Sequence, residues 1–363
     1  MPPAIQHTDV TQSPNLPWSA NQLERVETCP VCGGTLRDRL YEGLTDRVFR
    51  CAPGEWTLYS CRSCRSAYLD PRPTPNSIGL AYQNYFTHEV ASELDASRGF
   101  PLGSCKAAIR NDYLNSHFGA SLYPRLPLGR LAISLRPYTR LGWGRTLRHL
   151  ALPSKSARLL DIGCGNGDFL QIASSLGWDA LGMDPDPQAV AAVRKTGLSV
   201  LEGGLPHTGL PDEEFGAVTL SHVIEHVHDP VVALQEVHRI LKPGGKVWIA
   251  TPNLEGDGHH LFNRHWRGLE PPRHLVIFNA SSLKLACERT GFENVILPRP
   301  SPVARWYFLA SLKILQNQDP TGLEKPYILP LTLKWRARWS DLNAILFPGW
   351  GEELVMIGTK PHQ

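Results

Sequence analysis

Short apolar runs alternate with amphipathic stretches over the C-terminal two thirds of the chain. The apolar runs have the length of strands and occupy residues 159–162, 180–184, 199–201, 215–220, 246–251, 294–297 and 353–359. Stretches with helical periodicity lie between them, at residues 168–176, 187–196, 230–241 and 281–290. Strands that alternate with helices in this way predict a doubly wound α/β fold with a mostly parallel sheet and right-handed crossovers.

Three glycines directly follow the first of these strands. Asp161 closes the strand, and Gly163, Gly165 and Gly167 come next at every second position. Glycines leave no Cβ between backbone and ligand, so a nucleoside can lie against this turn at the carboxyl end of the strand. The third glycine comes too early for the dinucleotide fingerprint. Asp161 would repel a pyrophosphate but would suit a ligand with a positive end.

A second carboxylate ends the next strand. Asp184 lies 21 residues beyond Gly163, where it can accept both ribose hydroxyls of a nucleoside held on the first turn. The alternative role of a helix N-cap fits Asp186 better, because Asp186 directly precedes Pro187 at the start of the expected helix.

These residues resemble motif I of the class I S-adenosylmethionine (SAM) methyltransferases, whose cofactor carries an ammonium and a sulfonium but no phosphate. The resemblance implies a seven-stranded Rossmann-like sheet that residues 294–297 and 353–359 close, one of them antiparallel. It also places Glu202 near the adenine. Ser221, at the carboxyl end of the strand at 215–220, completes the expected cofactor-binding residues.

The N-terminal part contains two CxxC pairs, Cys29 with Cys32 and Cys61 with Cys64. Four thiolates at this spacing complete a closed tetrahedral zinc site, which has no open position for water and is therefore structural. Unlinked thiols or redox pairs are disfavoured, because neither pair opens a helix in a βαβ unit. Cys51 is left out of the predicted site.

The order of CPxCG, CxxC, DPRP and YxxYF elements is similar to the N-terminal portion of bacterial methyltransferases found with polysaccharide, lipid and natural-product pathways.

Candidate chemistry gathers after the strand at 215–220. His222, Glu225 and His226 share one face if this segment is helical. Three roles stay open: a brace for the pocket wall by His226, a general base for a substrate hydroxyl, and a divalent-metal site. In the long loop at 252–278, His274 belongs to an element that resembles the "RHL" of this subgroup. His226 and His274 are therefore the candidate proton acceptors.

Between Asp112 and Asp161 there is no acidic residue, while eight basic residues are present. They are Arg125, Arg130, Arg136, Arg140, Arg145, Arg148, Lys155 and Arg158. One interpretation is an amphipathic cover with a solvated basic face. The others are contact through residues 125–158 with an anionic substrate such as a nucleotide sugar or lipid phosphate, with a membrane surface, or with RNA.

Composition adds broader limits. The 363 residues carry a net charge of +3, which does not demand a nucleic-acid partner, and no apolar run has the length of a membrane span. Residues 1–22 lack a signal-peptide pattern, and the cysteine pattern favours a reducing, cytoplasmic compartment. We expect four regions, in this order: a disordered lead-in at 1–27, a zinc ribbon and connector at 28–86, a basic helical segment at 87–150, and a methyltransferase domain at 151–361 with an insertion at 299–348.

The combined prediction is a SAM-dependent methyltransferase with a structural zinc ion. Its expected acceptor is an oxygen or carbon of a sugar, a glycolipid or a small natural product. The main alternative is an RNA base methyltransferase that binds RNA through its zinc module and basic segment. A non-enzymatic zinc-ribbon protein is less consistent with the sequence, because Asp161, the three glycines and Asp184 are all present. The insertion either covers the substrate site or forms a dimer contact.

Overall fold

The fold is given by a computed structural model. It describes residues 18–82, 101–118, 123–135, 141, 144–151, 153, 157–321, 323 and 328–362. Residues 1–17 of the expected disordered lead-in lie outside the described residues. The expectation is wrong for the rest of the lead-in, because Ala20–Gln22 form a 3-10 helix, Leu23–Glu24 form a strand and Val26 is buried.

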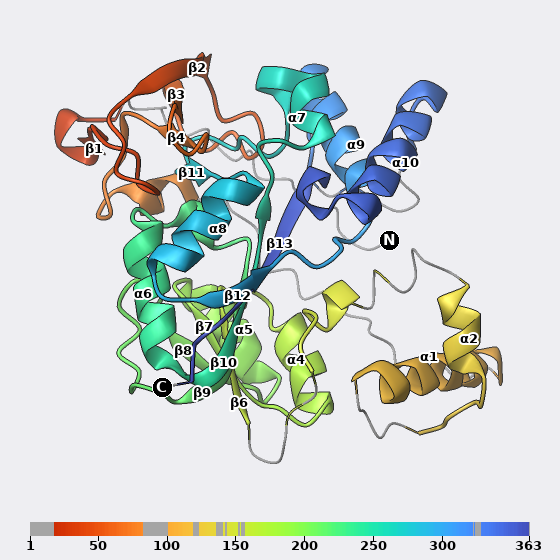
Figure 1. Ribbon diagram of the computed structural model, residues 1–363. Helices are drawn as coiled ribbons and strands as arrows, with labels where there is room; N and C mark the ends of the chain where they lie inside the picture. Colours follow the sequence, from red (N-terminus) through yellow and green to blue (C-terminus); the bar gives the residue numbers. More distant parts are fainter. Residues whose placement is uncertain are drawn as a thin grey trace, which may run out of the picture.

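A seven-stranded sheet forms the centre of the molecule (Figure 1). Its strand order is β12-β13-β10-β9-β6-β7-β8, and the sheet is parallel except for β13, which pairs antiparallel with both neighbours. In chain order the strands are β6 (Arg158–Ile162), β7 (Asp179–Asp184), β8 (Ser199–Glu202), β9 (Phe215–Ser221), β10 (Leu241–Pro252), β12 (Glu293–Ile296) and β13 (Glu353–Thr359). The predicted mostly parallel sheet with one antiparallel closing strand is thus confirmed.

Helices cover both faces of this sheet because successive strand residues point to opposite sides. Leu159 packs into the core under α4 (Asp168–Ser175) and α5 (Pro187–Lys195). Leu160 packs into the opposite core, under α6 (Pro230–Ile240) and α8 (Ala280–Arg289). Both leucines are fully buried, which stabilises the fold by about 2 kcal/mol for each side chain.

The cysteine-rich ribbon is built from short strands above the carboxyl edge of the large sheet (Figure 1). Its sheet has the order β11-β4-β3-β2. The strands are β2 (Arg37–Leu44), β3 (Trp56–Cys61), β4 (Ala67–Leu69) and β11 (Val276–Ile277). The strand expected between the two CxxC pairs is therefore β3. A two-stranded ribbon of β1 (Leu23–Glu24) and β5 (Arg72–Pro73) lies beside this sheet, with the 3-10 helices η1 (Ala20–Gln22) and η2 (Ile78–Tyr82).

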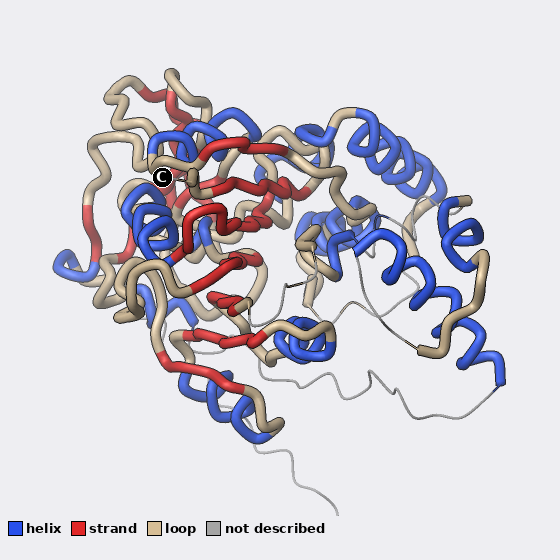
Figure 2. Tube along the Cα trace, turned by 60° about the horizontal axis from the view of Figure 1, so that its bottom comes forward, coloured by secondary structure: helices blue, strands red, loops and turns tan. Residues whose placement is uncertain are grey.

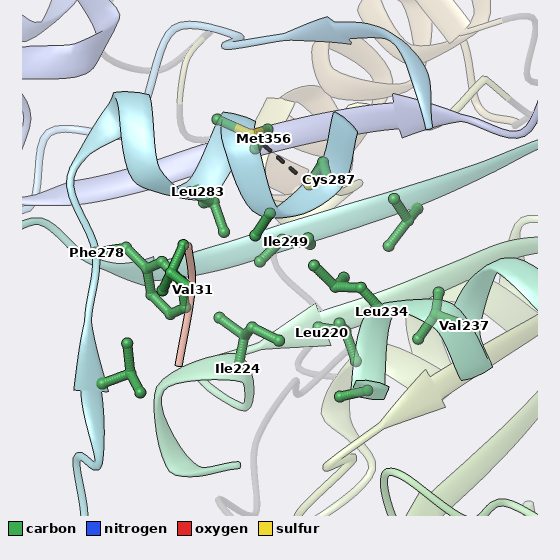
Figure 3. Close-up of a cluster of buried hydrophobic side chains, with 14 of the residues drawn as sticks. Val31, Leu220, Ile224, Leu234, Val237, Ile249, Phe278, Leu283, Cys287 and Met356 are labelled. Atoms are coloured by element: carbon green, nitrogen blue, oxygen red, sulfur yellow. Dashed lines mark hydrogen bonds between the residues drawn. The ribbon is translucent and has the colours of Figure 1, made fainter. Parts of the chain in front are cut away.

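The ribbon and the large sheet share one core, although the sequence separates them. β11 comes from the loop after β10, yet it pairs with β4 of the ribbon. Figure 3 shows Val31 of the ribbon among Ile224, Phe278 and Leu283 of the main fold. Side chains from both sides of the boundary expected near residue 86 therefore pack together in one apolar core.

The remaining helices lie outside the sheet. The loop after β10 forms α7 (Asp257–Phe262) and η4 (Asn263–His265). The insertion forms α9 (Ala304–Leu315), α10 (Leu331–Leu346) and η5 (Pro348–Trp350). The expected basic helical segment contains α1 (Pro101–Phe118) and α2 (Gly129–Ser134). Within the described ranges, no helix combines the length and apolar character needed to cross a bilayer.

Candidate functional site

The glycine turn forms as the sequence predicts, at the carboxyl end of β6. Gly163, Gly165 and Gly167 all have positive φ angles, of 68°, 52° and 81°. A Cβ on Gly163 would lie 2.5 Å from Cγ2 of Val223, so a side chain there would collide with the neighbouring loop. A Cβ on Gly165 would meet no atom within 4 Å. The turn thus offers bare backbone beside open space, as a closely held nucleoside requires.

Asp184 at the tip of β7 is tied to this turn. One carboxylate oxygen accepts a hydrogen bond from the Gly165 amide at 2.8 Å, and the other accepts one from the Asp186 amide at 3.0 Å. Burial raises the pKa of Asp184, and these two amides counteract part of the rise. Asp186 caps α5 by accepting from the Gln188 amide. The division of roles expected for the two aspartates is consistent with these contacts.

Asp161 is paired with a cation of the chain, a partner that its sequence position did not indicate. Its carboxylate is fully buried and forms a two-pronged ion pair with Arg148. It also accepts a hydrogen bond from Thr219 at 2.9 Å. The cation that satisfies Asp161 therefore comes from the chain itself, 13 residues upstream. A carboxylate held in this way positions the end of β6.

Four adjacent strands bring the expected cofactor residues to one edge. In spatial order these are Ser221 at the end of β9, the glycine turn after β6, Asp184 at the end of β7 and Glu202 at the end of β8. Asp184 and Glu202 are direct register partners, and the Gly203 amide donates to the Asp184 carbonyl at 3.0 Å. Residues far apart in sequence thus line one continuous edge, because parallel strands end on the same side.

The segment after β9 does not form the helix that would place His222, Glu225 and His226 on one face. Only η3 (Ile224–His226) is helical, and His222 has a φ of 55°. His222 nevertheless contacts Glu225 at 3.2 Å through Nδ1 and Glu353 at 2.9 Å through Nε2. The positive φ turns His222 toward β13, a partner that helical spacing could not indicate.

His222 belongs to a buried charged network. Burial alone would lower the pKa of His222, but its hydrogen bonds to Glu225 and Glu353 outweigh that effect and raise the pKa to about 9. The Glu353 carboxylate also receives two hydrogen bonds from Arg145, at 2.8 and 2.9 Å. The His222 imidazole is therefore a cation at neutral pH and a poor candidate for a proton acceptor.

His226 and His274 come together, with ring centroids 4.8 Å apart. Nδ1 of His226 lies 3.0 Å from the Arg273 carbonyl and 3.0 Å from the Tyr82 hydroxyl. Nδ1 of His274 lies 2.7 Å from the Gly268 carbonyl. Since a carbonyl only accepts, each neutral ring keeps its proton on Nδ1, so Nε2 is the nitrogen that can accept one. Nε2 of His274 lies 3.8 Å from the Glu270 carboxylate.

The two histidines differ in their exposure to solvent. His226 is half-buried, whereas His274 is 4% exposed, and burial lowers the pKa of His274 to about 4. One ligand atom each from His226, His274 and Glu225 lie within 4.8 Å of one another. The alternative of a divalent-metal site would therefore use Glu225, His226 and His274 as ligands. The sequence had indicated His222 in place of His274.

Arg273 is the residue that sequence reasoning missed. Its guanidinium is completely buried, pairs with Asp46 of the ribbon and Glu270 of the loop, and donates to the Ala81 carbonyl. It thereby joins the segment that carries Tyr82 to the one that carries His274. A charged residue beside a candidate histidine was the available signal, but its partners Asp46 and Ala81 are more than 190 residues away along the chain.

The four predicted zinc ligands form a compact cluster. The Sγ atoms of Cys29 and Cys64 are 3.6 Å apart, and those of Cys32 and Cys61 are 3.5 Å apart. A tetrahedral zinc ion with bonds of about 2.3 Å needs sulfur atoms about 3.8 Å apart, so the cluster fits this ion. Cys51 lies elsewhere, against Asp46 and Ala81, as its omission from the site implied.

Among the described residues of the basic segment, four of the five arginines are ion-paired and Arg130 is exposed. Four of its arginines form ion pairs: Arg125 with Asp112, Arg145 with Glu353, Arg148 with Asp161, and Arg158 with Asp179 and Glu214. Arg136, Arg140 and Lys155 lie outside the described residues. Most of the acidic partners come from other parts of the chain, which a local charge count cannot detect.

Comparison with known proteins identifies the central region. Residues 137–297 match the family model described as "Methyltransferase domain". The chain is 30% identical to a ubiquinone biosynthesis O-methyltransferase from Methylococcus capsulatus, over 44% of this chain and 63% of that protein. It is 31% identical to a probable S-adenosylmethionine-dependent methyltransferase from Mycolicibacterium smegmatis, over 37% of this chain and 51% of that protein. The matched regions thus span about half to two thirds of these relatives.

Among solved structures, a SAM-dependent methyltransferase from Archaeoglobus fulgidus matches 61% of this chain and 94% of its own, with a TM-score of 0.42 and 20% identity.

Proposed function

Because residues 137–297 form a methyltransferase domain of the class I, SAM-dependent family, we propose that the chain transfers a methyl group to a small-molecule acceptor. The proposed acceptor atom is an oxygen or carbon of a sugar, a glycolipid or a small natural product. When bound, SAM supplies a methyl group made electrophilic by its sulfonium. The protein has to bind both reactants, align them and keep water away.

The observation that carries this proposal is the link between the glycine turn and Asp184. Open space lies beside Gly165, and the Gly165 amide holds the Asp184 carboxylate at 2.8 Å. A nucleoside against the turn would place its ribose hydroxyls at this carboxylate, which accepts hydrogen bonds from both. Glu202 and Ser221 flank this position on the same edge and are assigned to the cofactor pocket.

We assign acceptor activation to His226. It is half-buried, whereas His274 is almost fully enclosed, so His226 has the better access to a substrate. With Nδ1–H held by the Arg273 carbonyl, Nε2 of His226 can take the proton of an acceptor hydroxyl or acidic C–H. His274 packs edge-on against His226 and orients its ring, which makes His274 a positioning residue.

The cofactor assignment is tested by calorimetric titration with SAM. Asp184→Ala removes hydrogen bonds to a charged group, so we expect the Kd for SAM to rise about 10- to 100-fold. Asp186→Ala is the matched control, because it removes only the cap of α5 and should leave the Kd within about two-fold. Wild-type protein that fails to bind SAM would disprove the proposed function.

The acceptor assignment needs a methyl-transfer screen with labelled SAM against nucleotide sugars, glycolipids and RNA. With an accepted substrate, His226→Ala should lower kcat about 10²- to 10⁴-fold without changing SAM affinity. A normal rate in His226→Ala would exclude the base role. Methylation of RNA alone, with strongly salt-dependent binding, would favour the RNA alternative over the acceptors proposed here.

A further inference from the structure

An unbroken apolar stripe runs along the solvent side of α10. Its members follow each other at intervals of three or four residues, the spacing of one helix face. They are Leu331, Trp335, Trp339, Leu342 and Leu346, with exposed fractions of 68%, 60%, 60%, 42% and 63%. Phe347 and Trp350 extend the stripe beyond the end of the helix, at 57% and 64%.

The helix is anchored by its other face, so the exposure of the stripe does not come from a detached segment. Ala337, Ser340, Asp341 and Ala344 are buried on that side. Asp341 accepts a hydrogen bond from the Ala304 amide at the start of α9. The bidentate contact of Arg336 with Asp257 ties α10 to α7. The fold therefore holds the stripe outward.

Exposed apolar side chains are concentrated here. Among the described residues, twenty large apolar side chains are exposed, and eight of them lie between residues 328 and 350. Single exposed leucines are common on protein surfaces, but a contiguous group with three tryptophans marks an interaction surface. No partner from the described part of the chain covers it.

The charges beside the stripe indicate which partner fits. The three basic side chains of α10 lie outside its buried face, with Arg336 and Arg338 exposed and Lys334 half-buried, while the one acidic residue of the helix, Asp341, is buried. Arg338 lies over the Trp335 ring at 5.0 Å. Two acidic groups, Glu255 and Asp257, line a pocket that Trp339 and Trp350 also border. Both are ion-paired, Glu255 with Arg65 and Asp257 with Arg336. Positive charge therefore accompanies the outward stripe.

This pattern matches helices that lie in a membrane interface. Such helices carry tryptophan and leucine on one face and lysine or arginine on the flanks, which bind anionic head groups. Tryptophan suits that depth because its ring is apolar while its N–H remains a hydrogen-bond donor. We propose that α10 docks the protein on the surface of an anionic lipid bilayer.

A second apolar group lies on the same side of the molecule. Leu128, Leu131 and Leu135 around α2 are 68%, 56% and 76% exposed, next to exposed Arg130. Figures 1 and 2 both show α1, α2 and α10 on the right, away from the cysteine ribbon on the left. This inference does not depend on the methyl-transfer activity.

The test is vesicle flotation of the full chain. We expect flotation with phosphatidylcholine vesicles that contain about 30% phosphatidylglycerol, weakening with added salt, and little flotation with phosphatidylcholine alone. Trp335→Ser/Trp339→Ser should lower the partition coefficient at least about 10-fold. Lys334→Glu/Arg338→Glu should remove the preference for anionic vesicles.

The matched control is Leu36→Ser/Ile296→Ser, which removes two apolar side chains with 65% and 56% exposure from other surfaces. It should float like the wild type. Circular dichroism and thermal unfolding of each variant report that it is folded. Wild-type protein that stays at the bottom with anionic vesicles would overturn the proposal, as would equal flotation of the tryptophan variant. A wild-type dimer that the tryptophan variant converts to monomer, without flotation, would instead identify α10 as a subunit contact.

Discussion

The ion pair between Arg148 and Asp161 shows how single side chains set the geometry of the cofactor edge. Both groups are buried, and burial raises the pKa of Asp161 while it lowers that of Arg148. Each charge is therefore tolerated only because the other is present. The Arg148 guanidinium also lies 3.6 Å from the centroid of the Phe169 ring at the start of α4. The pair consequently fixes β6, α4 and the segment before them in one arrangement.

Replacing one partner should be costly. Arg148→Met leaves an unpaired carboxylate in the interior, so we expect the free energy of unfolding to fall by about 3–5 kcal/mol in urea denaturation. Arg148→Met/Asp161→Asn removes both charges and should recover part of this loss. A single variant that loses less than about 1 kcal/mol would show that water reaches Asp161 and that the pair is not needed.

His222 gives the fold a dependence on pH on the alkaline side. Its pKa of about 9 exceeds the value near 6.5 of an unfolded histidine, so folding favours the protonated form. The corresponding stability is complete below pH about 6.5 and is lost as the pH rises through about 9. The side chain is 35% exposed, and solvent therefore screens part of the effect.

The predicted result is a steeper loss of stability for the wild type than for His222→Gln between pH 7 and 10. Urea denaturation of both proteins across this range measures it. Parallel curves for the two proteins would mean that the carboxylates of Glu225 and Glu353 do not hold the His222 proton.

Among the elements, the cysteine ribbon depends most on a group outside the polypeptide. Its strands are short, and its two knuckles are closed by backbone bonds from Gly33 to Cys29 and from Arg65 to Cys61. Small units of this kind fold by coupling metal binding to folding. We therefore expect the four cysteines, with their metal bound, to stabilise the ribbon as a hydrophobic core would.

We predict one tightly bound zinc ion for each chain and a marked fall in Tm after its removal by a chelator. Cys61→Ser should lose the metal and show the same fall. Cys51→Ser is the control, since its hydroxyl can keep the contacts with Asp46 and Ala81. Metal analysis together with thermal unfolding measures both effects. Full zinc content in Cys61→Ser would contradict the four-cysteine assignment.

Elements with strong local signals were the predictable ones. Asp186 with Pro187 starts α5, and Asp229 with Pro230 starts α6, where the sequence placed them. The segment at 222–226 was not predictable in the same way. Its apolar residues and histidines fit a helix, but contacts with β13 and β11 hold it as a single 3-10 turn.

For the whole molecule, the ribbon shares strand pairing and an apolar core with the fold around the seven-stranded sheet, so we expect the two regions to fold as one unit. The pairing of β4 with β11, the Asp46–Arg273 ion pair and the packing of Val31 against Phe278 all cross the expected boundary. Loss of the ribbon would expose this apolar surface and remove Asp46, one of the two carboxylate partners of Arg273.

Deleting residues 1–82 should therefore prevent cooperative folding of the remainder. Thermal unfolding of the intact chain should be a single transition by circular dichroism and by tryptophan fluorescence. A deletion variant that unfolds cooperatively and binds SAM normally would show that the two regions are independent.

The sequence by itself determined the alternation of strands and helices, the glycine turn with its two aspartates, and the two CxxC pairs. These features are local, because strand and helix period, glycine φ and ligand spacing act over a few residues. Tertiary structure alone decided that Arg148 satisfies Asp161, that His222 meets Glu353, and that Arg273 joins the ribbon to the candidate site. A buried charge needs an opposite charge beside it. Which residue supplies that charge depends on how the whole chain folds, so the local sequence does not indicate it.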